Sequence, residues 1–442
     1  MASPPQLPQE PIHWVSKPLA RFIQIETSAA CLLLLFSIIS LILANSPWSG
    51  DFLLLWETPL GIHIGNLEFS RSIHAWINDG LMTIFFFFVS LELKRELVLG
   101  ELHDPRIATL PIIAALGGML IPALFYFILQ SGEPGQNGWG TVMTTDTAFV
   151  VGCLALVGRH IPQSLRIFML SLAIVDDIGA ILIVAIGYNT GINWMSIGVS
   201  LIGFALVYLM KKLGVRSFIA YFLTGSLIWC AVDASGIHAT ITGVILGLMT
   251  PTVTWVTDKQ LHKILEYVVS YPEGEHWSGD TEDRKALLTA KIAAREVLSP
   301  VEQLEIILHP WIGYFILPLF ALANAGMSID ISDVTNSVTA SVFLGFVLGK
   351  PIGIFGFSFI AVFLGLAKFP RDFDWLLLAS GSVLAGIGFT MAIFIANLAF
   401  DQNLLNAARL GILAASIFCA LVGIGMFLIH RWLYSNQINQ FE

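Results

Sequence analysis

The amino-acid sequence predicts an all-α polytopic membrane protein with twelve transmembrane helices, an inverted-topology repeat whose two broken helices cross at mid-membrane, and a small extracytoplasmic β-hairpin. Three observations carry this prediction: the low content of charge, the number of apolar runs, and the distribution of Lys and Arg. Of the 442 residues, 56% are hydrophobic and 12% are charged, whereas soluble domains carry roughly 25% charged residues. This composition excludes a secreted or disordered protein, and the net charge of −9 excludes a nucleic-acid-binding one.

The membrane-spanning helices are predicted from the lengths of the apolar runs. A bilayer core about 30 Å thick requires about 20 mostly apolar residues in each helix. Twelve runs approach this length, and they lie at 26–45, 73–93, 107–129, 140–158, 164–187, 194–210, 217–233, 236–251, 309–327, 337–364, 375–400 and 407–429. An even number of spans puts both ends of the chain on the same side of the membrane.

The positions of Lys and Arg orient these helices. If the N-terminus is cytoplasmic, all but three of the 22 Lys and Arg residues fall on the cytoplasmic side. The exceptions are Arg71 and Arg409 on the outer side and Lys350 inside a span. Because positive charge is retained in the cytoplasm, we expect both termini there.

The extramembrane segments follow from the same count. We expect a cytoplasmic N-terminal segment at 1–25, a twelve-helix membrane domain at 26–432 and a cytoplasmic tail at 433–442. Residues 254–308 form a long, charged cytoplasmic loop between spans eight and nine.

One outer segment has the pattern of a β-hairpin. Apolar residues alternate on both sides of Gly65-Asn66, which predicts a hairpin at about 58–70. Because an isolated hairpin is marginally stable in water, we expect it to pair with a second copy of the chain.

Four ionisable residues in mid-span carry the most information about function: Asp146, Asp176, Asp177 and Lys350. Each costs roughly 2.5–3.5 kcal/mol at the bilayer centre even on the mildest scale. Adjacent carboxylates in a low-dielectric site resist ionising together, so the Asp pair exchanges protons readily. Oxygen ligands also suit small hard cations. The pair therefore predicts a site that holds either protons or a small cation.

Lys350 is predicted to be the counter-charge of these acids. It either holds the structure together or itself carries a proton, and the sequence leaves both alternatives open. Glu92 lies near a span end, a position that is typical of a snorkelling or capping residue. His238 and His309 open spans eight and nine, where capping is the ordinary role and pH sensing is the alternative.

Two spans contain poor helix formers at mid-membrane. They are Thr144–Thr147 in span four and Gly386–Thr390 in span eleven, and such breaks are tolerated only where they line a cavity or are buried in protein. Each is the middle of a triplet of spans, at about 107–187 and 337–429, and an offset of seven spans inverts one triplet relative to the other. The breaks are expected at Thr145, Asp146, Gly386 and Gly388. Asp146 and Lys350 have the charges that opposed helix ends require.

The sequence resembles the NhaA family of bacterial sodium/proton antiporters over residues 20–432. Seven motifs carry this resemblance: WINDGLMTIFFFFVSLELKREL (Trp76–Leu97), TTDTAF (Thr144–Phe149), LAIVDDIGA (Leu172–Ala180), GIHATITGVILG (Gly236–Gly247), LHPWIGYFILPLFALANAG (Leu308–Gly326), GKPIGI (Gly349–Ile354) and AGIGFTMAIFIANLAF (Ala385–Phe400). NhaA is itself a known example of an inverted-repeat transporter, so the repeat and the resemblance are not independent predictions.

The resemblance implies electrogenic exchange of cytoplasmic Na+ or Li+ for external protons, about two protons per Na+, by alternating access in the bacterial inner membrane. It implies a role in sodium and pH homeostasis, no cofactor, and a homodimer formed through the outer hairpin. It also implies site roles: Asp176 and Asp177 as the ion-binding pair with Asp177 the more direct ligand, Thr145 and Asp146 beside them, Lys350 as their partner, and Glu92, Glu305 and His238 as pH-responsive residues.

Three other functions fit the sequence less well. An ion channel would need rings of like groups along a pore, and a carrier of organic anions or bile acids would not need buried adjacent acids. The chain has no nucleophile–base pair, and its four cysteines lie in apolar runs without a CxxC pair, so neither an enzyme nor a metalloprotein is expected. A secondary active transporter in the lipid bilayer, with Na+, Li+ and H+ as its partners, is the prediction.

Overall fold

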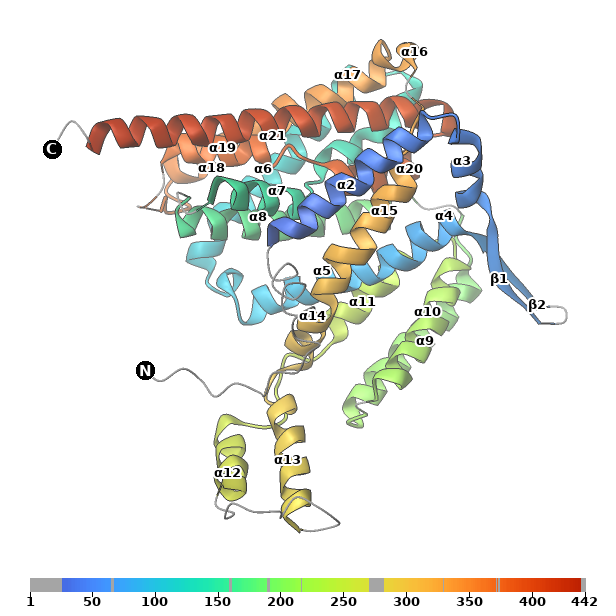
Figure 1. Cartoon of the computed structure of the whole chain (residues 1–442), viewed down its shortest axis with the longest axis vertical. Coiled ribbons are helices and arrows are strands. Elements are labelled where there is room, and N and C mark those ends of the chain that lie inside the picture. The colour runs from blue at the N-terminus through green and yellow to red at the C-terminus, as the bar shows by residue number, and fades with distance from the viewer. Residues whose placement is uncertain are drawn as a thin grey trace. The chain divides into compact units, whose positions relative to one another are not determined.

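In the computed structural model the described residues are mostly helical and contain one two-stranded sheet (Figure 1). The structure describes residues 26–64, 67–158, 161–188, 191–215, 217–269, 282–328, 330–370, 372 and 374–438. The predicted segment 1–25, the hairpin tip Gly65-Asn66 and the last residues of the tail lie outside these ranges. The chain divides into a first unit (Met1–Leu81, Pro105–Tyr188 and Pro310–Glu442) and a second unit (Met82–Asp104 and Asn189–His309).

The first unit contains the longer helices and the hairpin. Its α-helices are α2 (Glu26–Ala44), α3 (Ser49–Glu57), α4 (Ile73–Ala75), α6 (Pro105–Leu129), α7 (Thr147–Val157), α8 (Gln163–Gly187), α15 (Leu317–Asn324), α16 (Ile331–Val334), α17 (Ser337–Leu344), α18 (Lys350–Phe363), α19 (Trp375–Leu384), α20 (Phe389–Ala399) and α21 (Gln402–Ile438). Wider π-helical turns occupy Trp76–Leu81, Ile312–Ile316 and Gly345–Gly349, and a 3₁₀-helix occupies Pro134–Met143.

The second unit is a smaller set of helices: α5 (Met82–Val98), α9 (Trp194–Lys212), α10 (Phe218–Asp233), α11 (Thr240–Met249), α12 (Asp258–Val269), α13 (Glu282–Glu296) and α14 (Pro300–Trp311), with a 3₁₀ turn at Glu101–His103. Helix α14 runs on across the unit boundary. Helices α12 and α13 occupy much of the predicted loop 254–308.

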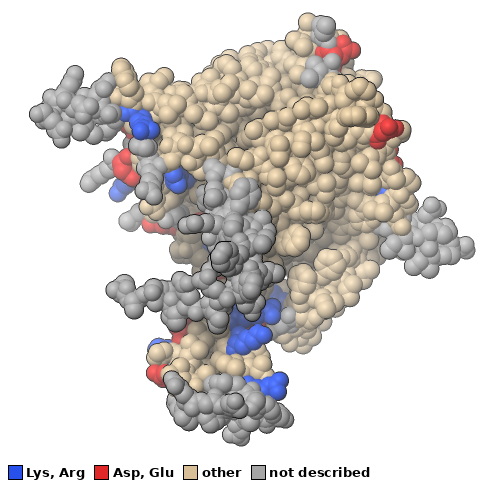
Figure 2. Space-filling view, in the orientation of Figure 1, with Lys and Arg blue, Asp and Glu red and all other residues tan. Residues whose placement is uncertain are grey.

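The length and composition of the helices fit a polytopic membrane protein. Seven described helices are long and apolar enough to cross a bilayer, or ten if each bent pair counts as one span. Two shorter apolar helices lie at Phe218–Asp233 and Thr240–Met249. Figure 2 shows that most of the visible face is uncharged, with Lys, Arg, Asp and Glu near its margins.

The ninth span begins earlier than the predicted residue 309. Ser299 and Glu302 form a capping box, in which the Ser299 N–H donates to Glu302 Oε2 at 2.9 Å and the Glu302 N–H donates to Ser299 Oγ at 3.3 Å. Pro300 then occupies the first helical position, which suits proline. Glu305 and His309 therefore lie inside α14, and the prediction that His309 opens a span is wrong.

The first span ends at a sharp turn that the sequence analysis missed. Helix α3 is bent by 115° from α2. The cause is local, because Pro47 cannot continue a helix and disfavours helical backbone at Ser46. The chain then leads from α3 into the hairpin.

The predicted hairpin is present in the first unit. Strands β1 (Pro59–Ile64) and β2 (Leu67–Ser72) pair antiparallel from Pro59↔Ser72 to Ile64↔Leu67. The register leaves two residues for the connection, which matches the two-residue turn that the sequence predicts.

Two spans of the first unit break at the predicted residues. The 3₁₀-helix Pro134–Met143 and α7 meet at 46°, and α19 and α20 meet at 47°. The intervening residues are Thr144–Asp146 and 385–388. Both breaks leave helix ends inside the unit, where their backbone groups require partners.

A glycine contact holds α6 against α18. A Cβ atom at Gly117 would lie 2.2 Å from the Gly353 carbonyl oxygen, and one at Gly353 would lie 2.1 Å from the Gly117 carbonyl oxygen. Only glycine permits this approach, which is a common packing solution between membrane helices. Since Lys350 begins α18 one turn earlier, the contact places the Lys350 backbone close to α6.

Candidate ion-binding site

Asp146 satisfies the N-termini of both half-helices. As the N-cap of α7, its Oδ1 accepts the Phe149 N–H at 3.2 Å. Its Oδ2 accepts the Thr390 N–H at 3.0 Å and the Thr390 hydroxyl at 2.5 Å, both from the start of α20. The positive ends of two helices thus meet at one carboxylate, which is the charge that they favour.

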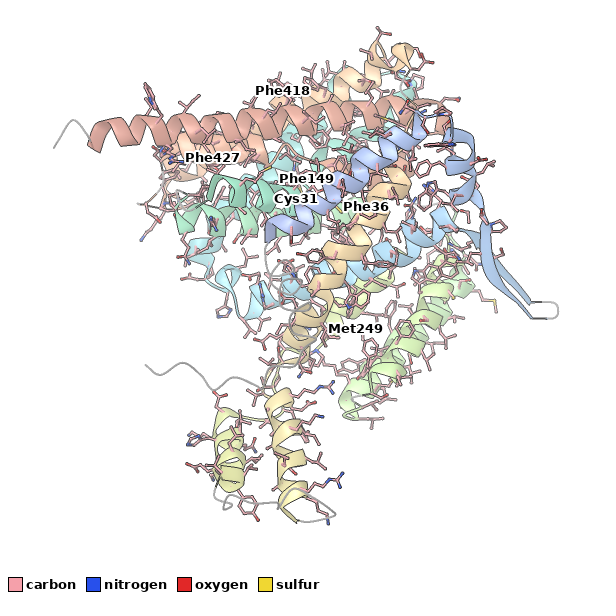
Figure 3. The ribbon with its side chains drawn as sticks, in the orientation of Figure 1. Cys31, Phe36, Phe149, Met249, Phe418 and Phe427 are labelled. Carbon is pink, nitrogen blue, oxygen red and sulfur yellow. The ribbon has the colours of Figure 1, made fainter. Side chains whose placement is uncertain are left out.

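Backbone and ring contacts also join the two breaks. The Asp146 N–H donates to the Ile387 carbonyl oxygen at 2.7 Å. Phe149, labelled in Figure 3, lies edge to face with Phe389, with 5.3 Å between the ring centroids. The breaks at residues 144–146 and 385–388 are therefore in direct contact, although about 240 residues separate them in the sequence.

The second charged group is built around Asp176 on α8. Its Oδ2 accepts from the Lys350 ammonium at 2.7 Å and from the Thr145 hydroxyl at 2.6 Å. Lys350 also contacts the Thr145 hydroxyl, which lies 3.1 Å from the carbonyl oxygen of Ala385 at the end of α19. The ammonium thus lies one hydroxyl away from a helix C-terminus, the end that favours positive charge.

These groups are removed from solvent. Lys350 is fully buried, and Asp146, Asp176 and Asp177 are 2%, 1% and 6% exposed. Asp176 Oδ1 has no hydrogen-bond partner among the described residues. A buried carboxylate oxygen without a partner is unfavourable, so this atom is available to a proton or a cation. Asp177, next on α8, is near enough to interact electrostatically with Lys350.

Two glycines allow the second break to pack tightly. A Cβ atom at Gly388 would lie 2.4 Å from Phe346 Cζ, and one at Gly386 would lie 2.6 Å from Cys419 Sγ. Gly386 and Gly388 therefore occupy positions where a larger residue would push the break away from its neighbours. Close packing, and not a positive φ angle, therefore accounts for glycine at these two positions.

The predicted pH-responsive residues lie in the second unit or at its end. Arg95 pairs with Glu305 at 2.6 Å and with Glu96 at 2.9 Å. Glu92, one turn before Glu96 on α5, interacts electrostatically with Glu305 and Arg95. The structure thus brings Glu92 and Glu305 into one charged cluster.

The two predicted histidines are positioned differently. His309 packs against Phe88, with 5.9 Å between the ring centroids. His238 lies in the turn that precedes α11.

Two features of the site escaped the sequence analysis. Thr390 holds Asp146, and the Gly117–Gly353 contact positions Lys350. A threonine in a helix and a glycine in an apolar run are common, so neither carries a signal by itself. The recurrence of glycine every fourth residue at Gly345, Gly349 and Gly353 was the one available hint of a close helix contact.

The donor set suits small hard cations and protons rather than transition metals. Among the described residues, no group of three or more His, Cys, Asp or Glu side chains could hold a metal ion. The available ligands are two carboxylates with hydroxyl and carbonyl oxygens beside them, all in a site without solvent exposure. Oxygen ligands of this kind suit hard cations better than soft metals.

The fold and the site together define a multi-pass membrane protein with a buried acid–lysine pair at the junction of two broken helices. The model of the family described as Na+/H+ antiporter 1 matches residues 20–427. The chain therefore belongs to the Na+/H+ antiporter 1 family, which comprises secondary transporters and not enzymes.

Similar proteins match over nearly their whole length. The "Na(+)/H(+) antiporter NhaA 2" of Vibrio vulnificus (strain CMCP6) is 55% identical over 432 residues, which cover 98% of this chain and 96% of that protein. The "Na(+)/H(+) antiporter NhaA 1" of Acidiphilium cryptum (strain JF-5) is 55% identical over 419 residues, with coverages of 95% and 93%. The "Na(+)/H(+) antiporter NhaA" of Rhizobium meliloti (strain 1021) is 54% identical over 418 residues, with coverages of 95% and 96%.

Proposed function

We propose that this chain exchanges Na+ or Li+ for protons at the Asp176–Asp177 pair. The observation that carries the proposal is the buried ion pair between Lys350 and Asp176. The second carboxylate oxygen of Asp176, Oδ1, has no hydrogen-bond partner among the described residues. A charge pair in this position is costly. A function in which the site alternately binds protons and a cation accounts for the presence of these charged groups in the membrane.

Competition for the same oxygens couples the movement of the cation to that of the protons. A cation that binds Asp176 and Asp177 requires both carboxylates to be ionised, and it weakens the attraction of Asp176 for Lys350. Protonation of the acids removes the ligands and releases the cation. Thr145 contributes a hydroxyl oxygen beside Asp176, and Asp146 keeps the two breaks together.

The exchange is electrogenic in this account. Each monovalent cation competes with protons on two ionisable groups, which are Asp176 and Asp177 or, if the lysine of the Asp176 ion pair releases its proton, Asp177 and Lys350. About two protons then enter for each Na+ that leaves, and one net charge crosses the membrane. A potential of 100 mV supplies about 2.3 kcal/mol for each such charge, which supports sodium extrusion for sodium and pH homeostasis.

Alternating access rests on a twelve-span inverted repeat. We infer that the shorter helices α10 and α11 join the ten longer candidates as spans of the domain at 26–432. The triplets α6–α8 and α17–α21 form the repeats. Their middle spans bend by similar angles, 46° and 47°, and the Gly117–Gly353 contact is reciprocal, as an internal two-fold axis requires.

The proposed topology puts both termini in the cytoplasm of a bacterium and the domain in its inner membrane. The segments 1–25 and 433–442 and the loop at 254–308 are then cytoplasmic, and the β1–β2 hairpin is outside. Since the hairpin contains only two strands, pairing with a second copy would extend its sheet. We propose that it forms a homodimer in this way.

We assign the pH response to the cluster of Glu92 and Glu305 with Arg95, and to His238 and His309. Protonation of Glu305 would remove the charge that holds Arg95 at 2.6 Å. The cluster lies where α5 and α14 approach their cytoplasmic ends in the proposed topology. A change of cytoplasmic pH would therefore reach it directly.

The test is the collapse of a proton gradient by Na+ in energised everted vesicles, with the parent chain and Asp177→Asn compared between pH 6.5 and 9. We expect the parent to collapse the gradient and Asp177→Asn to lose at least ~100-fold in rate, because two positioned carboxylates are needed. Asp401→Asn, at an exposed position outside the site, is the matched control. Undiminished exchange by Asp177→Asn, or no response from well-inserted parent protein, would refute the proposal.

A further inference from the structure

A network of side-chain amides lies in the first unit, apart from the acid–lysine pair. Its centre is Asn324, which is fully buried at the end of α15. The Asn324 amide donates to Asn78 Oδ1 at 2.8 Å and to the Phe320 carbonyl oxygen at 3.0 Å. Its Oδ1 accepts the Asn397 amide at 2.7 Å and lies 3.1 Å from His74 Nε2. All four hydrogen-bonding positions of the Asn324 side chain are therefore filled.

The network extends to a guanidinium group on α21. Arg409 Nη2 donates to Asn397 Oδ1 at 2.7 Å. Arg409 Nε is buried without a hydrogen-bond partner, and the described residues include no acidic partner within ion-pair distance of this side chain. Asn397 thus joins α20 to both α15 and α21. A positive charge without a carboxylate partner is an electrostatic barrier to cations.

The network lies on the same face of α20 as the ion-binding site. Thr390, Phe394 and Asn397 are spaced i, i+4 and i+7, which places them on one side of a helix. Asn397 is about 10 Å along the axis from Thr390, which holds Asp146. Between these two levels, Phe394 packs against Phe320 of α15 with 6.3 Å between the ring centroids, and both rings are buried.

Two layers therefore separate Asp146 from the end of the unit that carries the hairpin. The inner layer is aromatic, formed by Phe320 and Phe394. The outer layer is polar, formed by the Asn324–Asn397 hydrogen bond, and it includes His74, two residues after the end of strand β2. An aromatic constriction stops ions by excluding water. The amide layer holds α15, α20 and α21 together.

We propose that the Asn324–Asn397 pair, with Arg409 and the Phe320–Phe394 layer, is the closed outer gate of the exchanger. This inference rests on the proposed function, because a gate has meaning only for a chain that moves ions through the site. Release of a cation to the outside requires α15 and α20 to separate here. Arg409 then repels external cations while Asn397 holds it, and external protons reach the acids only after the gate opens.

A reversible cross-link between α15 and α20 tests the gate. Asn324→Cys and Asn397→Cys are combined in a chain whose four native cysteines are replaced by serine, reconstituted in proteoliposomes and treated with a short bifunctional methanethiosulfonate reagent. We expect at least tenfold slower Na+/H+ exchange after cross-linking and recovery on reduction, with ²²Na+ binding to the solubilised cross-linked protein retained. The reagent should not change the rate of either single-cysteine chain.

Unchanged exchange in fully cross-linked protein would overturn the gate. The proposed function fails separately, because then the untreated double-cysteine chain and the parent would show neither Na+ binding nor exchange. The two failures are therefore distinguishable in one set of samples.

A second variant tests the gate without a cross-link. Asn397→Ala removes hydrogen bonds to Asn324 and Arg409, so the equilibrium should shift toward the outward-open state. We expect the half-saturating Na+ concentration to rise about tenfold from the cytoplasmic side and to fall from the outer side. Asn406→Ala, which removes an amide of α21 outside the network, should change neither value. Equal changes on both sides, or none, would contradict the gate.

Discussion

Lys350 is fully buried, and its ammonium group pairs with Asp176 at 2.7 Å. Lys350→Met leaves the buried carboxylate without its counter-charge, so we expect a loss of about 3–5 kcal/mol of stability. The double variant Asp176→Asn/Lys350→Met should recover most of this loss. Thermal unfolding of the detergent-solubilised protein measures both.

The partly exposed Arg71–Asp79 pair provides the control, because Arg71→Gln should cost less than about 1 kcal/mol. A Lys350→Met chain as stable as the parent would show that the buried pair contributes nothing to the fold.

Thr390 makes two hydrogen bonds to Asp146, through its hydroxyl and its backbone N–H. Thr390→Val keeps the shape and removes the hydroxyl, which should cost about 1.5–3 kcal/mol because the acceptor is charged. We also expect slower exchange, since Asp146 holds the two breaks together. Thr390→Ser should restore both the melting temperature and the rate. Normal values for Thr390→Val would mean that the backbone N–H suffices.

At the residue scale, charge in an apolar run was the signal that the sequence offered. It predicted Asp146, Asp176, Asp177 and Lys350 as a set, and the structure brings Asp176 and Lys350 together. It offered Lys350 and the helix ends as partners for Asp146, but not Thr390, because Thr390 lies 244 residues away and hydroxyls are frequent in membrane helices. The pairing of residues across breaks is a tertiary contact, which local sequence does not encode.

At the scale of helices, the approach of α6 and α18 depends on Gly117 and Gly353. Gly117→Ala places a Cβ atom 2.2 Å from the Gly353 carbonyl oxygen, so the helices must move apart at a cost of about 1–3 kcal/mol or more. Since Lys350 begins α18, exchange should slow as well. Melting temperature and exchange rate measure the two effects.

Gly356→Ala, on the same helix α18, is a matched control. A Cβ atom there meets nothing within 4 Å, and alanine favours the helix by about 0.5–1 kcal/mol over glycine. We expect this variant to be at least as stable as the parent. If the two alanine variants behaved alike, the close contact would not be what holds α6 to α18.

The centres of the helices could be predicted from apolar length, but several ends could not. The run at 309–327 looked like a complete span, while the helix begins at Pro300 because Ser299 and Glu302 cap it. Helix α3 was missed because its nine residues are too few to cross a bilayer. Helix caps and proline turns involve only a few residues. A count of apolar residues over a window of about 20 residues does not detect them.

At the scale of the whole molecule, the composition alone excluded soluble classes, and the family match over residues 20–427 identifies a secondary transporter. The described helices provide seven to ten long candidate spans. The proposed twelve-span inverted repeat goes beyond that number because α10 and α11 are short. Topology mapping of both termini and of the hairpin would test this arrangement.

Competition between Na+ and protons for the Asp176–Asp177 pair is the basis of the proposed exchange. Its most direct test is calorimetric titration of the purified protein with Na+ at pH 6.5, 7.5 and 8.5 in buffers of different ionisation enthalpy. At pH values where both Asp176 and Asp177 are protonated, the dissociation constant for Na+ should rise by ~100-fold for each unit by which the pH falls. About two protons should be released for each Na+ bound. Asp177→Asn should abolish the binding. A dissociation constant that is independent of pH, without proton release, would contradict the account.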